Sequence, residues 1–363
     1  MQQITRLKNL PLKTLALAGL MTAFSVAASA LTCSTSGTPT VDFGTVDVLS
    51  GIYPTASQTI TITCTKPGIE SGRETRQCLN IGEGTGSSVG IGGPNAYSPR
   101  ILKSDDANGN GTGFQIYQDG GYSTFWGTDS GFPPNKQDPD QVRRPAFFTS
   151  YSQSHTLYMR MEPLSTGINL TTSLQTTPPG IYKSDFSGIH TSFKAPMRTV
   201  TLAIEQNCSD LYLGTTGEFP FKVQATVLPN CKITTPAADI DFGTQAGTAT
   251  NLQGTTAVAV QCTRTTPYFI GLRPGNGNTA GAGVMSAISP VGNTDTVPYQ
   301  LRQATGMSGT IWGNTATSLA AGNGVAGTGL GSSAITYPIY ATVPTANRAA
   351  GSYQDTVTIT VNY

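Results

Sequence analysis

The residues of this chain with the most specific chemistry are six cysteines and two histidines. Cys33 and Cys64 are 31 residues apart, and so are Cys231 and Cys262. A zinc site would need closely spaced ligands, but no Cys-x-x-Cys is present and the histidines stand alone. The even number of cysteines therefore favours disulfides, which persist in an oxidising compartment such as the periplasm.

Three short motifs resemble known sites but lack the surroundings that those sites need. Gly86–Gly90 (GSSVG) matches a nucleophile elbow, yet no strand, helix and histidine accompany it. Gly322–Gly327 (GNGVAG) matches a dinucleotide motif without a βαβ unit. Asp106–Gly111 begins like a calcium loop, but Tyr117 stands where a glutamate is required, so we expect a hairpin turn. We predict no catalysis, cofactor or metal. Paired carboxylates stay open, because their separation is a three-dimensional fact.

The N-terminal 30 residues are typical of a cleaved signal peptide. Arg6, Lys8 and Lys13 precede the apolar run TLALAGLMTAFSV, and Ala28-Ser29-Ala30 fits a cleavage site. Loss of three basic residues lowers the formal net charge from +1 to −2. This balance gives no electrostatic reason to bind nucleic acid or an anionic membrane. We expect a protein that is exported through the periplasm.

The elements that position these residues are predicted to be β-strands. Glycine is abundant, charged residues make up 11% of the chain, and no long stretch has helical periodicity. Short runs of alternating polar and apolar residues, separated by turn residues, are typical of an all-β sandwich or barrel. The candidate strands are Thr59–Cys64, Gly113–Gln118, Thr156–Met161, Thr199–Glu205, Ala257–Cys262 and Thr356–Tyr363.

The chain contains an internal repeat. Cys33 is followed by VDFGT, and Cys231 is followed by IDFGT, before each second cysteine. Further on, FWG answers IWG, and GIYKSD answers GSYQD. This order predicts two copies of one domain, 31–228 and 229–363, with a boundary near Pro229-Asn230.

The repeat also selects among the 15 pairings that six cysteines allow. Cys33–Cys64 and Cys231–Cys262 should be equivalent bonds. Cys78 and Cys208 then pair by elimination.

These motifs resemble the spore coat protein U-type domain family, most closely over Cys231–Tyr363 and more loosely over Cys33–Val227. The resemblance implies two tandem immunoglobulin-like β-sandwiches, the second lacking its final strand. That family supplies subunits of archaic chaperone–usher pili, in which each subunit receives a strand from its neighbour. Two tandem copies resemble the adhesin at the pilus tip. The implied partners are an adjacent pilin subunit, a periplasmic chaperone and the outer-membrane usher.

One alternating segment lies between the two copies. In FPFKVQATV the apolar positions are Phe219, Phe221, Val223, Ala225 and Val227. We expect this segment, 219–227, to complete the first domain within the same chain. The second copy ends on Val357, Ile359, Val361 and Tyr363, which should border an empty acceptor groove. Only two residues would precede Cys33 after signal removal, so we expect a subunit that accepts a strand and donates none.

Apolar loops of the first copy are the candidate adhesive surface, directed at a hydrophobic abiotic or host surface in biofilm formation. Trp126 matches Trp312 and should be core, although a carbohydrate pocket on Trp126 or Tyr151 is an alternative. A shaft or capping pilin without a binding role is another, and a secreted glycan-binding lectin or carbohydrate-active enzyme is a third. The candidate loop residues are Val89, Ile91, Tyr97, Phe132, Phe147, Phe148, Ile189, Phe193 and Met197.

Overall fold

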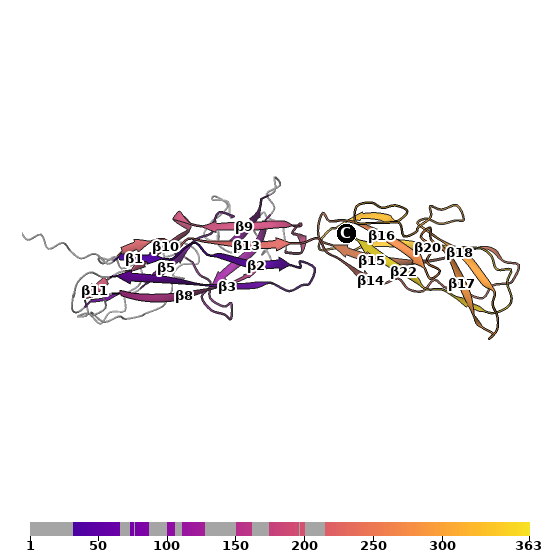
Figure 1. The fold of residues 1–363 in the computed structure, drawn as a ribbon, viewed down its shortest axis with the longest axis horizontal. Coiled ribbons are helices and arrows are strands. Elements are labelled where there is room, and N and C mark those ends of the chain that lie inside the picture. The colour runs from indigo at the N-terminus through magenta and orange to yellow at the C-terminus, as the bar shows by residue number, and fades with distance from the viewer. Residues whose placement is uncertain are drawn as a thin grey trace, which may run out of the picture.

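The computed structural model describes residues 32–65, 73–75, 77–86, 100–105, 111–127, 150–161, 174–195, 197–199 and 215–363. In these ranges the protein is all-β, apart from two short 3-10 turns, Leu174–Thr176 and Gly188–His190. Two β-sandwich domains lie end to end in an elongated molecule (Figure 1). The expected signal peptide lies outside the described residues, and within them no helix is long and apolar enough to cross a membrane.

The N-terminal domain has an eight-stranded sheet in the order β1-β3-β8-β7-β6-β9-β13-β2, with two smaller sheets, β12-β10-β5 and β11-β4. Its strands are β1 (Thr32–Thr35), β2 (Thr40–Val46), β3 (Thr55–Thr65), β4 (Arg73–Thr75), β5 (Cys78–Ile81), β6 (Arg100–Ser104), β7 (Gly111–Tyr117), β8 (Ser150–Met161), β9 (Gly180–Phe186), β10 (Thr191–Ala195), β11 (Met197–Thr199), β12 (Thr215–Gly217) and β13 (Phe221–Val227).

The C-terminal domain has a six-stranded sheet, β14-β15-β20-β18-β17-β21, facing a three-stranded sheet, β19-β16-β22. Its strands are β14 (Cys231–Thr235), β15 (Thr250–Cys262), β16 (Pro267–Pro274), β17 (Ala282–Ser289), β18 (Thr296–Arg302), β19 (Val325–Thr328), β20 (Ile335–Thr345), β21 (Ser352–Gln354) and β22 (Val357–Asn362).

The alternating runs form strands as predicted wherever they are described. Three of them fall in β3, β8 and β15, and Gly113–Gln118 and Thr356–Tyr363 fall largely in β7 and β22. Of the run Thr199–Glu205, the structure describes only Thr199. Strands β6 and β7 pair antiparallel on either side of residues 106–110, as a hairpin requires, although that turn is itself outside the described residues.

The repeat is visible in both cores. Cys33–Cys64 and Cys231–Cys262 are disulfides, each joining the first strand of a domain to its neighbour. Cys78 is also disulfide-bonded, and its expected partner Cys208 lies outside the described residues.

The two tryptophans are equivalent core residues, as the repeat predicts. Trp126 and Trp312 are 3% and 1% exposed, and their indole N–H groups donate to the carbonyls of Leu79 and Ile270. An indole buried in this way supports its own domain. We therefore interpret Trp126 as a core residue of the first domain.

Candidate strand-accepting groove

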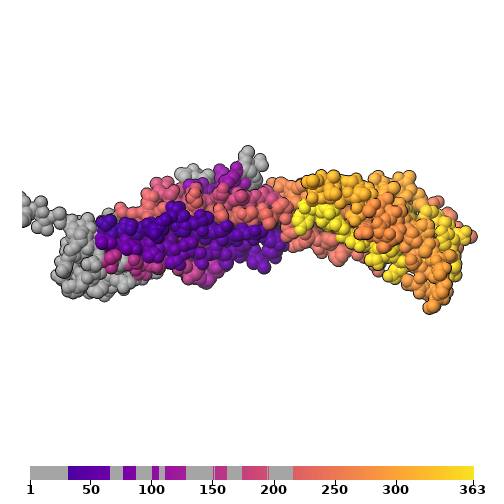
Figure 2. All heavy atoms as spheres, viewed as in Figure 1, coloured from indigo at the N-terminus to yellow at the C-terminus, as the bar shows by residue number. Residues whose placement is uncertain are grey.

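A groove of about 670 Å³ opens into the core of the C-terminal domain. One wall is the irregular segment 237–242, and the other is the chain from Tyr353 to Ile359, which includes the end of β21 and the start of β22. Its floor is made of core side chains of the six-stranded sheet, among them Met285, Tyr299, Leu301, Ile339 and Ala341. The yellow C-terminal strand is visible at the surface of this domain in Figure 2.

One wall of the groove presents an unpaired strand edge. Strand β22 pairs with β16 on one side, and in the fully described stretch 215–363 no strand pairs with its other side. Val357, Ile359 and Val361 consequently remain half-buried at the margin of the core. An open edge beside exposed core side chains is the condition under which another chain can add a strand.

The equivalent position in the N-terminal domain is filled. Strand β13 lies between β9 and β2, antiparallel to β9 and parallel to β2. Phe221, Val223, Ala225 and Val227 are each at most 1% exposed, and Phe219, just before the strand, is 1% exposed. Strand β12 continues the same line by pairing with β10. One stretch of chain, 215–227, therefore pairs with the full length of β9 and with Phe193–Ala195 of β10.

Aromatic rings hold β13 in place. The ring of Phe221 stacks on Phe186 with centroids 4.5 Å apart, and Phe186 meets Phe114 edge to face at 6.2 Å. Phe43 of β2 packs on Phe114 from the other side. The inserted strand thus bridges the two walls through one continuous row of buried rings.

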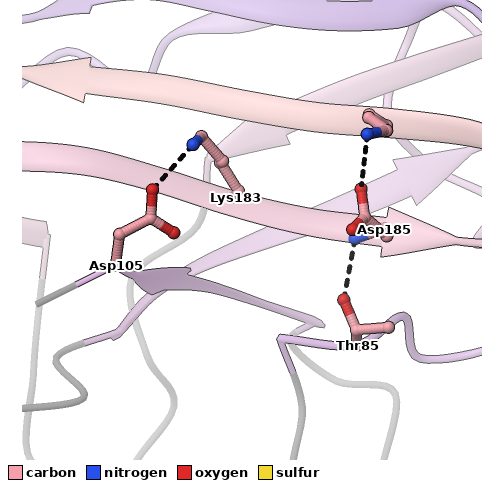
Figure 3. A network of polar contacts seen from close by, with 5 residues as sticks. Thr85, Asp105, Lys183 and Asp185 are labelled. Carbon is pink, nitrogen blue, oxygen red and sulfur yellow. Dashed lines mark hydrogen bonds and ion pairs between the residues drawn. The ribbon is translucent and has the colours of Figure 1, made fainter. Parts of the chain in front are cut away.

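The outer face of β13 makes polar contacts with both neighbours. Lys222 Nζ lies 3.8 Å from a carboxylate oxygen of Asp185 on β9, and Gln224 Nε2 donates to Asp42 of β2 over 2.7 Å. Figure 3 shows the Asp185 contacts, including the backbone N–H that donates to Thr85. These exposed contacts add little stability but align the strand with its neighbours.

A polar pair joins the floor of the empty groove to one of its walls. The Tyr299 hydroxyl donates to Asp355 over 2.6 Å, and Asp355 also accepts from the N–H groups of Gly275 and Thr356. Burial, reinforced by the hydrogen bond to Asp355 and its negative charge, raises the pKa of Tyr299, so the phenol stays protonated and can donate.

The two sets of strand residues that the sequence singles out lie in different domains, one set in the core of the first and the other beside the groove of the second. The apolar positions of 219–227 all face the core of the first domain. Val357 and Ile359 line the groove, Val361 continues the same strand, and Tyr363 follows it with 48% of its surface exposed.

The adhesive-loop candidates are mostly beyond what the structure describes. Ile189, in a 3-10 turn, is 89% exposed, and its contact with a surface stays a prediction. The prediction for Phe193 is corrected: it is 1% exposed, because its ring belongs to the core of the first domain, beneath the sheet in which β10 lies between β5 and β12. The candidates outside the described residues are Val89, Ile91, Tyr97, Phe132, Phe147 and Phe148, together with the side chains of Tyr151 and Met197.

Sequence reasoning missed the polar residues of the groove. Asp239 and Asp241 lie on one wall and Asp355 on the other. Asp241 could have been found, because it begins the second Asp-Phe-Gly-Thr motif and is therefore the equivalent of Asp42. The Tyr299–Asp355 pair spans 56 residues and carries no local signal.

The family model of the Spore Coat Protein U domain matches residues 19–186 and 218–360. The chain therefore belongs to the spore coat protein U domain family, as its motifs predict. The comparison with curated proteins gave no match.

Among solved structures, the chain is similar to the chaperone–tip adhesion subunit complex CsuC–CsuE of Acinetobacter baumannii, with 15% identity and a TM-score of 0.46, covering 92% of this chain and 100% of that one. It is also similar to the CupB6 tip adhesin of Pseudomonas aeruginosa, with 13% identity and a TM-score of 0.33, covering 92% and 94%. A third is CfaE, the adhesive subunit of CFA/I fimbria of enterotoxigenic Escherichia coli, with 9% identity and a TM-score of 0.31, covering 90% and 93%.

Proposed function

We propose that this protein is a two-domain tip adhesin of a chaperone–usher pilus. Its C-terminal domain accepts a β-strand from the adjacent subunit, and a periplasmic chaperone and the outer-membrane usher handle it before assembly. Its N-terminal domain attaches to a surface. The protein is exported, resides at the pilus tip and catalyses no reaction.

One observation carries the proposal: two copies of one domain differ in whether the same strand position is occupied. The first copy fills it with β13 of its own chain, and the second has a groove of about 670 Å³ there. Membership of the spore coat protein U domain family supports the same interpretation. Because the segment that precedes Cys231 is used inside the chain, it is not free to complete another subunit.

The adhesive role belongs to the self-completed domain. A domain that needs no partner strand is free to carry binding loops, and we assign these to the apolar segments around Ile91, Phe147 and Ile189. Ile189, which is 89% exposed, is the described residue that supports this assignment. A hydrophobic abiotic or host surface is the proposed target.

Strand uptake by the full chain tests the proposal. The chain is refolded with labelled nine-residue peptides of alternating apolar and polar residues, and binding is followed by fluorescence anisotropy. We expect one site per chain. Ile359→Asp, at a groove-lining position, should abolish binding, whereas Thr358→Asp, on the exposed face of the same strand, should preserve it. Absence of binding by every peptide, or equal binding by both variants, would contradict the proposal.

A further inference from the structure

The groove carries three carboxylates. Asp239 and Asp241 lie on one wall and Asp355 on the other, and all three line the same cavity. The lining, which falls entirely within the fully described stretch 215–363, contains no lysine, arginine or histidine. Within the part of the chain that the structure describes, none of the three is in an ion pair. The groove is therefore apolar in its floor and anionic along both walls.

At the three places that correspond to Asp239, Asp241 and Asp355, the first domain has one carboxylate. Asp42 corresponds to Asp241, since each accepts the N–H of the glycine two residues later over 2.7 Å. Two residues before Asp42 the first domain has Thr40, and two residues before Asp241 the second domain has Asp239.

Ser184 stands where the second domain has Asp355. Each follows by two residues a tyrosine, Tyr182 or Tyr353, whose hydroxyl donates to the carbonyl four residues earlier. A Cβ added at Gly84 would meet the Ser184 hydroxyl, and one added at Gly275 would meet the Asp355 carboxylate. The empty groove thus has carboxylates at two places where the filled position has Thr40 and Ser184; besides Asp42, the carboxylate that contacts β13 is Asp185, on the exposed face of β9.

Strand β13 shows which of its residues would meet these groups. Lys222 is in register with Thr40, Val223 with Ser184, and Gln224 with Asp42. In the second domain the same three strand positions would lie beside Asp239, Asp355 and Asp241. A strand like β13 would place a valine against Asp355 and one amide beside Asp241.

Strand insertion removes water from these carboxylates. An ionised carboxylate that loses water without gaining a partner is costly, so an apolar residue against Asp355 is unfavourable. Asp355 already accepts from Tyr299 and from two backbone N–H groups, but a further donor would still be favourable at its remaining lone pairs. Basic side chains beside Asp239 and Asp241 gain attraction in a partly desolvated setting.

We propose that the groove selects a strand of another pilus subunit that has basic side chains beside Asp239 and Asp241 and a serine- or threonine-sized donor opposite Asp355. The wall charges thereby favour a different subunit over β13 of this chain or of a second copy. This inference rests on the proposed function and specifies the chemistry of the partner at the same site.

Two peptides test the selection with the full chain. FPFKVQATV reproduces β13, and FPFKTKATV changes its valine to threonine and its glutamine to lysine at the two discriminating positions. We expect FPFKTKATV to bind about tenfold more tightly at low salt, with the advantage falling to about twofold in 1 M salt.

Variants of the chain assign the preference to residues. Asp239→Asn combined with Asp241→Asn should remove the salt-dependent part of the preference for FPFKTKATV. Asp355→Ser should restore tolerance of the valine in FPFKVQATV. Asp295→Asn, which removes one negative charge at a residue that does not line the groove, should retain the full preference. The side chains of Asp239 and Asp241 are exposed in an irregular segment, so we expect their replacement to leave the fold intact.

The outcomes separate this inference from the function on which it rests. Equal binding of the two peptides, or a preference that survives the Asp239 and Asp241 changes, would overturn the selection while leaving strand acceptance in place. If neither peptide binds, both the selection and the proposed function are overturned.

Discussion

Residues 40–45 (TVDFGT) and 239–244 (DIDFGT) have almost the same sequence and the same local turn, yet they differ in state. Gly44 and Gly243 both have positive φ, +70° and +68°, which their position after Asp-Phe requires. The first segment belongs to strand β2, with Val41 and Phe43 at 3% and 8% exposure. In the second, Ile240 and Phe242 are half-buried and no strand forms.

The difference between these segments comes from a partner rather than from local sequence. Strand β2 is hydrogen-bonded to β13, and residues 239–244 have no equivalent neighbour within the fully described stretch 215–363. A strand is stabilised by cross-strand pairing, so the same residues without a pair stay irregular. The second domain therefore has an open groove at the position that β13 occupies in the first domain.

The largest expected effect separates the filled position from the empty one. Val223→Asp places an unpaired charge at a site with 0% exposure and should destabilise the N-terminal domain by about 4 kcal/mol or more. The C-terminal domain should be unaffected. Because Trp126 and Trp312 are buried in different domains, urea unfolding in a Trp126→Phe or Trp312→Phe background reports one domain at a time. Lys222→Gln is the control on the exposed face.

The walls of the two positions should respond unequally to truncation. Phe186→Ala removes a ring stacked on Phe221 and should cost about 3–5 kcal/mol. Val357→Ala, at the half-buried wall of the empty groove, should cost about 1 kcal/mol, because its side chain has no strand packed over it. The same tryptophan-resolved unfolding measures both. Similar losses in the two domains would mean that the groove is closed in solution.

The disulfides should show where the two domains are alike. Cys33–Cys64 and Cys231–Cys262 close loops of the same length, 31 residues. Replacing either pair with serine should cost about 3–4 kcal/mol in its own domain, since the unfolded chain gains similar freedom. Each loss is measured by urea unfolding against the unsubstituted chain. A large difference between the two losses would contradict the equivalence of the two copies.

The smallest effect on stability is expected at the proposed binding surface. Ile189→Asp should change the free energy of unfolding by no more than about 0.5 kcal/mol, since the side chain is 89% exposed. Attachment of piliated cells to a hydrophobic surface should fall. Phe193→Asp is unsuitable for this purpose, because it would unfold the domain. Unchanged attachment with Ile189→Asp and Ile91→Asp together would favour a capping role.

Much of the fold could be predicted because the signals are local or repeated. The alternation in TITITC and AVAVQC predicts β3 and β15, and the duplicated Cys…Asp-Phe-Gly-Thr…Cys predicts two of the disulfides. The apolar positions of FPFKVQATV predict which face of β13 is buried. Each of these depends on a pattern within about ten residues or on its second copy.

What could not be predicted depends on distant partners. Phe193 lies in a five-residue strand whose burial comes from β5 and β12 on either side, neither of which is close to it in sequence. Arg100 is fully buried because the carbonyls of Ile81, Gly82 and Trp126 accept its guanidinium hydrogens. Such contacts are set by the tertiary fold, so a single sequence does not contain their signal.

Amide hydrogen exchange of 239–244 against 40–45 in the full chain tests the vacancy most directly. We predict fast exchange in 239–244 and slow exchange in 40–45, with protection of 239–244 appearing when FPFKTKATV is bound. Slow exchange in both segments without any added strand would mean that the second domain is already closed, and the account of a strand-accepting groove would be wrong.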